Sequence, residues 1–290
     1  MKLEYIVKDN KYNSIKEILK LHFHMSERFI LKLKKNNRFY INNSPTFMYS
    51  TIKTGDILTI DISFEEKSEN IIPAKMNLDI VFEDEFLIII NKPAGMPVHP
   101  SMAHFENSLS NGVQNYFEIQ KIKTKIRPVN RLDKDTSGIV IFAKSEYIQE
   151  CLVKQMANHT FKKYYLAILS GNLDKKSGTI SAPIARKPES IIEREISKNG
   201  QNAITHFSLI KNYDTFCLVK FQLETGRTHQ IRVHSKFIGH PILGDSLYGK
   251  TSEFIKRQAL HAYKISFIHP ISNKELIFET ALPDDINKLI

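Results

Sequence analysis

One stretch near the middle of the chain constrains the fold most strongly, because a charged loop runs directly into a segment that must be buried. Residues 127–138 read RPVNRLDKDTSG and lead into the apolar run Ile139–Ala143. Arg131 and Asp133 are two residues apart, so they share one face of an extended chain. The Thr-Ser-Gly sequence is typical of a turn, and the β-branched and aromatic residues after it predict a core strand. The stretch could present a catalytic group from a rigid scaffold, or it could simply cap a hairpin with an Arg–Asp pair.

Composition narrows the class of protein. The chain has 290 residues, of which 42% are hydrophobic and 25% charged, and this length predicts two globular domains. The net charge of +10 favours a polyanionic partner, and nucleic acid is the commonest. Cys151 and Cys217 form no CxxC pair, and no signal peptide or membrane-spanning run is visible. We therefore expect a cytoplasmic protein with no membrane association.

The N-terminal segment has helical periodicity and a lopsided charge. Apolar residues recur every three or four positions between residues 14 and 35, and Ser26 is expected to cap the second of two short helices. A short strand followed by a turn is expected at residues 38–43, and a turn followed by a strand at residues 55–60. Residues 11–53 hold nine basic and two acidic side chains, a net charge of +7. Because nearby counter-charges are missing, a phosphate-binding surface is favoured over an ordinary solvated helix face.

The rest of the chain predicts an α+β domain with many strands and few helices. The polar stretch 65–70 reads as a linker, which places a domain boundary after residue 70. A rigid proline-rich loop is expected at residues 91–100, and an amphipathic helix at residues 146–159. The expected strands are residues 78–82, 87–90, 139–142, 161–169, 215–223, 260–267 and 276–279.

Three common kinds of site are disfavoured. Residues 244–251, GDSLYGKT, match the pattern of a phosphate-binding loop, but no buried strand precedes them and no strand ending in Asp follows. The histidines lack the close spacing of zinc ligands, so no metal site is expected. Ser137 has no GxSxG context, so a serine triad is not supported.

Several ordered blocks of sequence resemble the RluA-type pseudouridine synthases. The blocks are NKPAGMPVHP at 91–100, NRLDKDTSGIVIFAK at 130–144, KYYLAILSG at 163–171, LETGRTHQIRVH at 223–234, GHPILGDSLYG at 239–249 and QALHAYKISFIHP at 258–270. Two positions depart from the family pattern: Asn130 stands where the signature has His, and Gln201 where Lys is frequent. The resemblance implies a mixed, mainly antiparallel sheet of the pseudouridine synthase fold, within an α+β protein.

The resemblance also implies a reaction, the isomerisation of uridine to pseudouridine in RNA without a metal or other cofactor. Asp133 would be the nucleophile, attacking the ribose or the base, or alternatively abstracting a ribose proton. Arg227 would pair with Asp133 and keep it ionised, and Tyr165 would stack on uracil and accept the C5 proton. Arg131 would fill the gap left by the extruded base. Further substrate contacts would come from Leu223, Lys163 and His99.

Residues 12–62 resemble the small RNA-binding domain of ribosomal protein S4. We therefore expect an N-terminal α/β RNA-binding domain at residues 1–70 and a catalytic domain at residues 71–290. The side chains expected to bind RNA are Arg28, Lys32, Lys34, Lys35 and Arg38. We expect a monomer that acts on large-subunit ribosomal RNA. The alternatives are the same chemistry on transfer RNA, or a catalytically silent RNA-binding protein that assists ribosome assembly.

Overall fold

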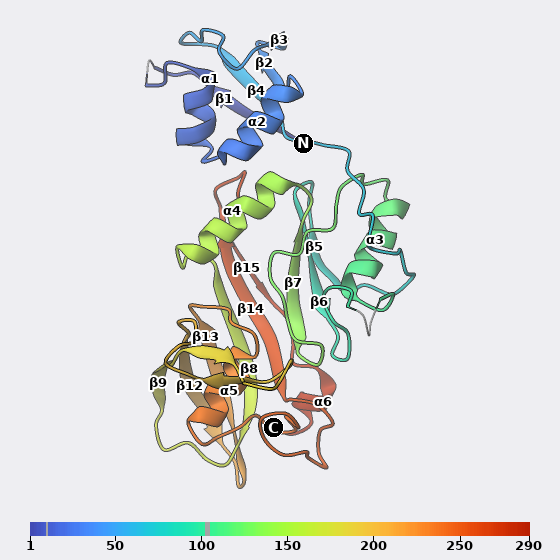
Figure 1. Ribbon diagram of the computed structural model, residues 1–290, viewed down its shortest axis with the longest axis vertical. Coiled ribbons are helices and arrows are strands. Elements are labelled where there is room, and N and C mark those ends of the chain that lie inside the picture. Colours follow the sequence, from blue (N-terminus) through green and yellow to red (C-terminus); the bar gives the residue numbers. More distant parts are fainter. Residues whose placement is uncertain (10, 102–104) are drawn as a thin grey trace.

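The computed structural model describes residues 1–9, 11–101 and 105–290 and has two parts joined by an extended segment (Figure 1). The N-terminal part is a four-stranded antiparallel sheet in the order β1-β4-β2-β3, accompanied by short helices. Its strands are β1 (Lys2–Ile6), β2 (Phe39–Ile41), β3 (Ser44–Thr46) and β4 (Ile57–Asp61). The expected boundary at residue 70 falls in the extended segment after β4, and it stays a prediction.

The helices of the N-terminal part break where the sequence predicts. The first helix consists of α1 (Ile15–Glu17) and a wider turn, η1 (Ile18–His22). The second helix, α2 (Glu27–Lys35), begins after Ser26, whose hydroxyl accepts a hydrogen bond from the backbone N–H of Phe29 at 3.2 Å. This cap satisfies one of the unpaired donors at the helix start.

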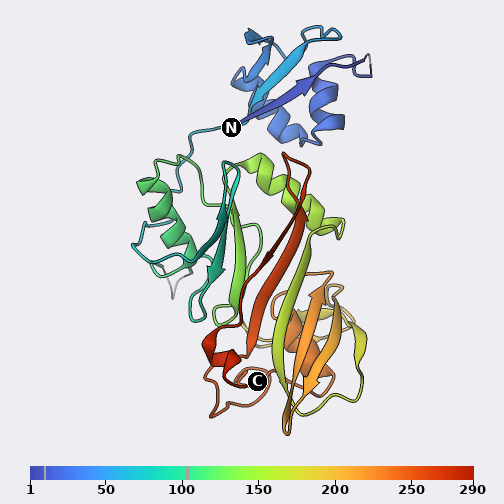
Figure 2. The ribbon, with the colours of Figure 1, turned by 180° about the vertical axis from the view of Figure 1, so that it is seen from behind.

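The larger part contains a nine-stranded sheet that is antiparallel except where β7 pairs with β14 (Figure 2). The order is β5-β6-β7-β14-β8-β13-β12-β9, and β15 pairs with β14 off this path. This confirms the predicted α+β class and the mainly antiparallel sheet. The strands are β5 (Ile80–Glu83), β6 (Leu87–Lys92), β7 (Ser137–Ala143), β8 (Lys162–Ser170), β9 (Ser177–Ser181), β12 (Ile204–Asn212), β13 (Phe216–Leu223), β14 (Leu260–Ile268) and β15 (Glu275–Glu279). A separate two-stranded sheet consists of β10 (Ile184–Arg186) and β11 (Arg194–Ile196).

Strand β7 is buried along its whole length because helices cover both of its faces. Alternate residues point to opposite sides of a strand. Val140 and Phe142 join the core cluster that contains α3 (Leu109–Ile119), whereas Ile139 and Ile141 join the cluster that contains α4 (Glu146–Ala157). The remaining helices are α5 (Gln230–Phe237) and α6 (Asp284–Asn287). Within the described residues, none of the helices has both the length and the apolar character that a membrane span requires.

The N-terminal part packs against α4 through a shared apolar core. Phe29 of α2 stacks on Tyr147 of α4 with ring centroids 5.9 Å apart, and the Tyr147 hydroxyl donates to the carbonyl of Phe23 at 3.0 Å. Leu33 and Ile148 belong to the same buried cluster. Because this contact buries aromatic and aliphatic surface from both parts, it fixes the N-terminal sheet above α4 (Figure 1).

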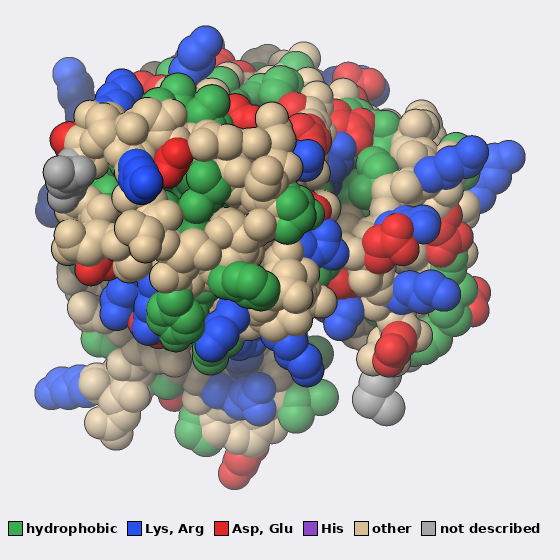
Figure 3. All heavy atoms as spheres, turned by 90° about the horizontal axis from the view of Figure 1, so that it is seen from above, with side chains coloured by type: hydrophobic (Ala, Val, Ile, Leu, Met, Phe, Trp, Pro, Cys, Tyr) green, Lys and Arg blue, Asp and Glu red, His purple; other side chains and the backbone are tan. Residues whose placement is uncertain are grey.

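The expectation that the N-terminal charges lack counter-charges is wrong. Lys32 forms ion pairs with Glu66 at 2.9 Å and with Glu146 at 3.0 Å, and Arg28 also pairs with Glu146. Arg38 pairs with Asp61 at 2.6 Å. A count over residues 11–53 misses these carboxylates because they lie outside that range. The face seen in Figure 3 accordingly shows acidic side chains interspersed with Lys and Arg.

Candidate active site

A cavity of about 760 Å³ opens where the charged loop before β7 faces the ends of β8 and β13. It brings together six of the predicted site residues, namely Arg131, Asp133, Lys163, Tyr165, Leu223 and Arg227. His99 is not among the described residues that line this cavity, and its Nδ1 lies 3.0 Å from the Ser110 hydroxyl instead. The structure therefore places the predicted catalytic residues in one site and does not place His99 with them.

The loop that carries Asp133 is held by Asn130, the residue that departs from the family signature. The Asn130 side chain donates to the carbonyl of Ile139 and accepts from the N–H of Ile141, both at 2.9 Å. An amide supplies one donor and one acceptor at once, so it can pair with both backbone groups. Asn130 thus fixes the loop against β7 directly.

Gly138 lets β7 begin close to β14. Its φ is +116°, and a Cβ at this position would lie 2.3 Å from the carbonyl oxygen of Ala262. Any other residue would clash with the neighbouring backbone and would also adopt a disfavoured φ. The prediction of a turn at residues 136–138 is wrong by a few positions: the turn lies at residues 134–135, and Ser137 and Gly138 already belong to β7, where they pair in parallel with β14.

The buried side chain of Lys92 ties the proline-rich loop to the catalytic loop. Its Nζ donates to the carbonyls of Pro93, Met96 and Lys134 at 2.8, 2.7 and 2.9 Å. Burial lowers the pKa of Lys92 to about 7, although Asp135 and Asp133 act in the opposite direction. Three carbonyl acceptors match the three donors of an ammonium, so Lys92 holds the backbone next to Asp133 in place.

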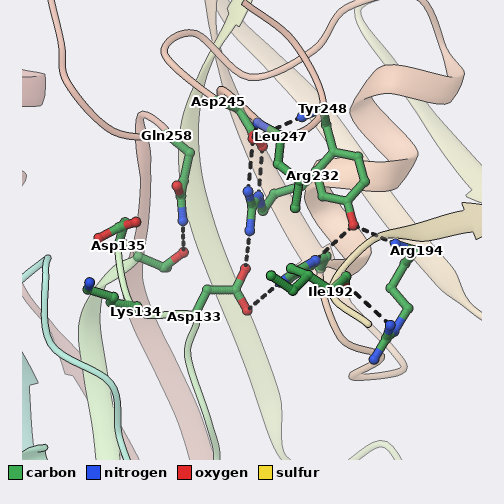
Figure 4. Close-up of polar contacts among 12 residues, drawn as sticks. Asp133, Lys134, Asp135, Ile192, Arg194, Arg232, Asp245, Leu247, Tyr248 and Gln258 are labelled. Atoms are coloured by element: carbon green, nitrogen blue, oxygen red, sulfur yellow. Dashed lines mark hydrogen bonds and ion pairs between the residues drawn. The ribbon is translucent and has the colours of Figure 1, made fainter. Parts of the chain in front are cut away.

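The cation that pairs with Asp133 is Arg232, not Arg227 as predicted. Oδ2 of Asp133 accepts from Nη1 of Arg232 at 3.2 Å, and Arg232 also forms a two-pronged pair with Asp245 through Nε and Nη2, at 2.7 and 2.8 Å (Figure 4). Burial alone would lower the pKa of Arg232, but its contacts with Asp245 and Asp133 raise it on balance. A permanently charged guanidinium therefore faces the carboxylate, in a geometry fixed by Asp245.

Arg227 lies on the exposed rim of the same cavity. Its Nε donates to the carbonyl of Asn202 at 3.0 Å, and its backbone N–H donates to Oε1 of Gln230 at 2.9 Å. The two arginines belong to the same sequence block, but α5 begins at Gln230, and so the helix turns Arg232 inward. No helix was predicted at residues 230–237, and without the start of α5 the inward direction of Arg232 could not be inferred from the sequence.

Tyr165 forms a buried wall next to the carboxylate. It lies on β8 opposite Phe221 of β13 and is 7% exposed. Burial, and secondly the charge of Asp133, raise the pKa of Tyr165, so its hydroxyl is protonated at neutral pH. Leu223, at the end of β13, and Lys163 complete this side of the cavity, and burial lowers the pKa of Lys163.

The arrangement suits a reaction at a flat, uncharged ring. A carboxylate faces a cavity between an aromatic wall and an apolar one, and a fixed guanidinium holds one of its oxygens. Such a carboxylate can act as a nucleophile or as a base. Among the described residues, no cluster of three His, Cys, Asp or Glu side chains could hold a metal ion.

Comparison with known proteins gives the class to which this fold and site belong. Residues 86–236 match the family model described as RNA pseudouridylate synthase, and this range includes Asp133, Tyr165, Arg227 and Arg232. The chain belongs to this family, and it is an RNA pseudouridine synthase, an isomerase.

Individual relatives agree with this assignment. The uncharacterized RNA pseudouridine synthase YjbO of Bacillus subtilis (strain 168) is 39% identical over 267 residues, which is 92% of this chain and 94% of the relative. Ribosomal large subunit pseudouridine synthase D of Zymomonas mobilis is 38% identical over 253 residues, covering 82% of this chain and 79% of the relative. The solved structure of human RNA Pseudouridylate Synthase Domain Containing 1 has a TM-score of 0.59 at 25% identity and covers 71% of this chain and 83% of its own.

Proposed function

We propose that Asp133 is the reacting carboxylate of this pseudouridine synthase. The observation that carries the proposal is its position: Asp133 faces the cavity with Oδ2 held by Arg232, while Tyr165 and Leu223 form the walls on which a uracil would lie. In the overall reaction the N1–C1′ bond breaks and a C5–C1′ bond forms. The C5 proton leaves, and N1 gains a proton. Attack on the ribose, attack on the base and removal of a ribose proton all begin from an ionised carboxylate.

We propose that Tyr165 acts in two stages. Before the reaction begins its phenol is neutral, and its ring offers a stacking surface for uracil. The negative charge of Asp133 is one of the two causes that raise the pKa of Tyr165. That charge disappears once the carboxylate forms a bond or takes a proton. The pKa of Tyr165 then falls, so the phenol can give its proton to N1 of the uracil, and the phenolate that forms can accept the C5 proton.

We propose large-subunit ribosomal RNA as the substrate and the N-terminal part as an S4-like domain that helps to bind it. Support for the substrate comes from relatives that carry the name ribosomal large subunit pseudouridine synthase D. Support for the domain comes from the exposed side chains of Lys34 and Lys35 on α2. Arg131, which is exposed on the loop before Asp133, would stack in the gap left by the extruded base.

The test is pseudouridine mapping across all RNAs from cells that lack the gene, complemented either with the natural protein or with Asp133→Asn. We expect pseudouridine to disappear from one or more sites in large-subunit ribosomal RNA and to return only with the natural protein. The variant should still bind RNA within a few-fold, because the substitution removes a charge and keeps the shape.

The same experiment separates the parts of the proposal. If Asp133→Asn restored the modification, Asp133 would not be the reacting carboxylate. If pseudouridine were lost from transfer RNA alone, the proposed reaction would stand, but the substrate would be transfer RNA. An unchanged map, together with an inactive purified protein, would contradict the proposed substrate altogether.

A further inference from the structure

His229 has an unusual backbone conformation that helix capping does not explain. Its φ and ψ are 58° and 20°, in the left-handed region, directly before α5. A residue at the start of a helix commonly uses its side chain to cap the first turn, but His229 makes no such hydrogen bond. A non-glycine residue is held in this region where the surrounding structure requires it, and such positions cluster at functional sites.

The side chain of His229 instead points back toward Tyr248. Its Nδ1 lies 2.8 Å from the Tyr248 hydroxyl, which accepts a hydrogen bond from the backbone N–H of Arg194, also at 2.8 Å. The hydroxyl accepts from Arg194, and its own proton is free for donation to Nδ1. In the tautomer that uses this proton, the imidazole N–H is on Nε2.

Nε2 of His229 faces the oxygen of Asp133 that Arg232 does not hold. The distance from Nε2 to Oδ1 is 3.9 Å, and that from Nη1 of Arg232 to Oδ2 is 3.2 Å. The His229 side chain is 12% exposed and lines the cavity, so solvent competes little for its N–H. Catalytic hydrogen bonds are often long in an empty site and shorten when substrate binds.

The residues around the Asp133 carboxylate are connected to one another by these and two further contacts. Tyr248 donates its backbone N–H to Asp245 at 3.2 Å, and its ring lies 5.0 Å from the guanidinium of Arg232. The residue that fixes the imidazole of His229 is thus also tied to the residues that fix the guanidinium. Oδ1 of Asp133 faces the imidazole of His229, and Oδ2 faces the guanidinium of Arg232.

We propose that His229 is a positioning residue for Asp133: its Nε2–H binds Oδ1 and sets the rotation of the carboxylate, while Tyr248 sets the tautomer. This inference rests on the proposed role of Asp133. The charged groups around the imidazole are Asp133, Asp245, Arg232 and Arg194. Burial lowers the pKa of His229, and Asp133 acts in the opposite direction, so the ring works as a neutral donor.

The test compares His229→Asn with His229→Gln. Asn tolerates the left-handed conformation, and its side chain can still meet the Tyr248 hydroxyl, but it is too short to reach Asp133. The amide nitrogen of Gln reaches about as far as Nε2. The assay is single-turnover release of tritium from RNA labelled at C5 of uridine, isolated from cells that lack the gene. The dissociation constant for the same RNA is measured alongside.

We expect His229→Asn to slow release about 10- to 100-fold, as for a misplaced reacting group, with RNA binding unchanged. His229→Gln should recover a large part of that loss. Tritium release by His229→Asn at the wild-type rate would overturn the inference. So would equal losses in both variants together with a lowered unfolding temperature, because that pattern indicates a structural role.

Two further variants keep the test decisive. If His229→Asn does not fold, the inference is tested with Tyr248→Phe. This variant keeps the aromatic ring beside Arg232 and removes the hydroxyl that sets the tautomer of His229. Slower release from bound RNA supports the inference, and a natural rate overturns it. Asp133→Asn is run in parallel: its activity would overturn the proposed function and this inference together. Its inactivity beside a fully active His229→Asn would overturn this inference alone.

Discussion

At the scale of residues, the site depends on which arginine is fixed. Arg232 is held by both oxygens of the fully buried Asp245, whereas the side chain of Arg227 is exposed and donates to the carbonyl of Asn202. Two parallel hydrogen bonds determine the plane of a guanidinium, which a single contact cannot do. Arg232 can therefore place a charge beside Asp133 reproducibly.

We expect Arg232→Lys to lower the single-turnover rate about 100-fold or more. Lysine keeps the positive charge, but it cannot form the two-pronged contact with Asp245 while it also reaches Asp133. Arg227→Lys is the matched comparison and should cost far less in rate, with its main effect on RNA affinity. The measurement is tritium release from saturating RNA. A larger loss of rate in Arg227→Lys would reverse the assignment of the two arginines.

At the scale of elements, α2 and α4 are joined by an ion-pair network around Lys32. Glu146 begins α4, and Glu66 lies in the segment between the two parts of the molecule, where it also pairs with Arg127 at 2.5 Å. Burial alone would raise the pKa values of Glu66 and Glu146, but their contacts with Lys32 and its neighbouring arginines lower them on balance. The segment between the parts is therefore fastened at Glu66.

This network predicts a definite dependence of stability on pH. A carboxyl group with a lowered pKa in the folded state stabilises the protein above its unfolded pKa, near 4.5 here, and this contribution is lost as pH falls through the folded pKa. We expect Glu146→Gln to reduce the free energy of unfolding by about 1–2 kcal/mol at neutral pH, since the pairs are only partly shielded from water. The difference from the natural protein should shrink below pH 4.5.

Glu65→Gln is the control for the Glu146 variant. Glu65 pairs with Lys123 at 2.9 Å, but both side chains are mostly exposed, so the pair is screened by solvent. Chemical denaturation of the two variants between pH 3 and pH 7 would separate the contributions. Equal effects would show that the network between α2 and α4 adds nothing beyond ordinary surface pairs.

At the scale of the whole molecule, the N-terminal part shares an apolar core with the catalytic part. Several of its basic side chains form ion pairs and are therefore not free to bind RNA. Arg28 and Lys32 pair across the contact with α4, and Arg38 pairs within its own sheet. Lys34 lies over the ring of Tyr49 at 4.9 Å, and both Lys34 and Lys35 are exposed. The exposed lysines are the better candidates for contact with phosphate.

We expect Lys34→Ala combined with Lys35→Ala to weaken RNA binding and to flatten its salt dependence. Each lost phosphate contact on single-stranded RNA should reduce the log–log slope by about 0.7. The matched control is the pair Lys175→Ala and Lys176→Ala, exposed lysines between β8 and β9, far from the N-terminal sheet (Figure 1). Binding is measured across a salt series. An unchanged slope in the α2 variant would exclude these two lysines from the RNA contact.

Most strands of the catalytic part were predictable because their signals are local. The run after Gly138 is apolar on both faces, and the structure buries both faces of β7. The predicted helix at residues 146–159 is α4, and the predicted cap at Ser26 begins α2. The helices α3, α5 and α6 were missed, and so were the strands β9, β10, β11 and β12. The rejected phosphate-binding pattern at residues 244–251 has a structural use, because the backbone N–H groups of Leu247 and Tyr248 bind Asp245.

By itself the sequence determined the class of protein, most of the core strands and the loop that presents Asp133, because periodicity, turn residues and ordered motifs act over short ranges. Only the tertiary structure decided which cation meets Asp133, which histidine faces it and which N-terminal charges are already paired. Arg232 lies 99 positions from Asp133, and Arg28 lies 118 positions from Glu146. Charges pair according to distance in space, and the packing of elements sets that distance after their local order is fixed.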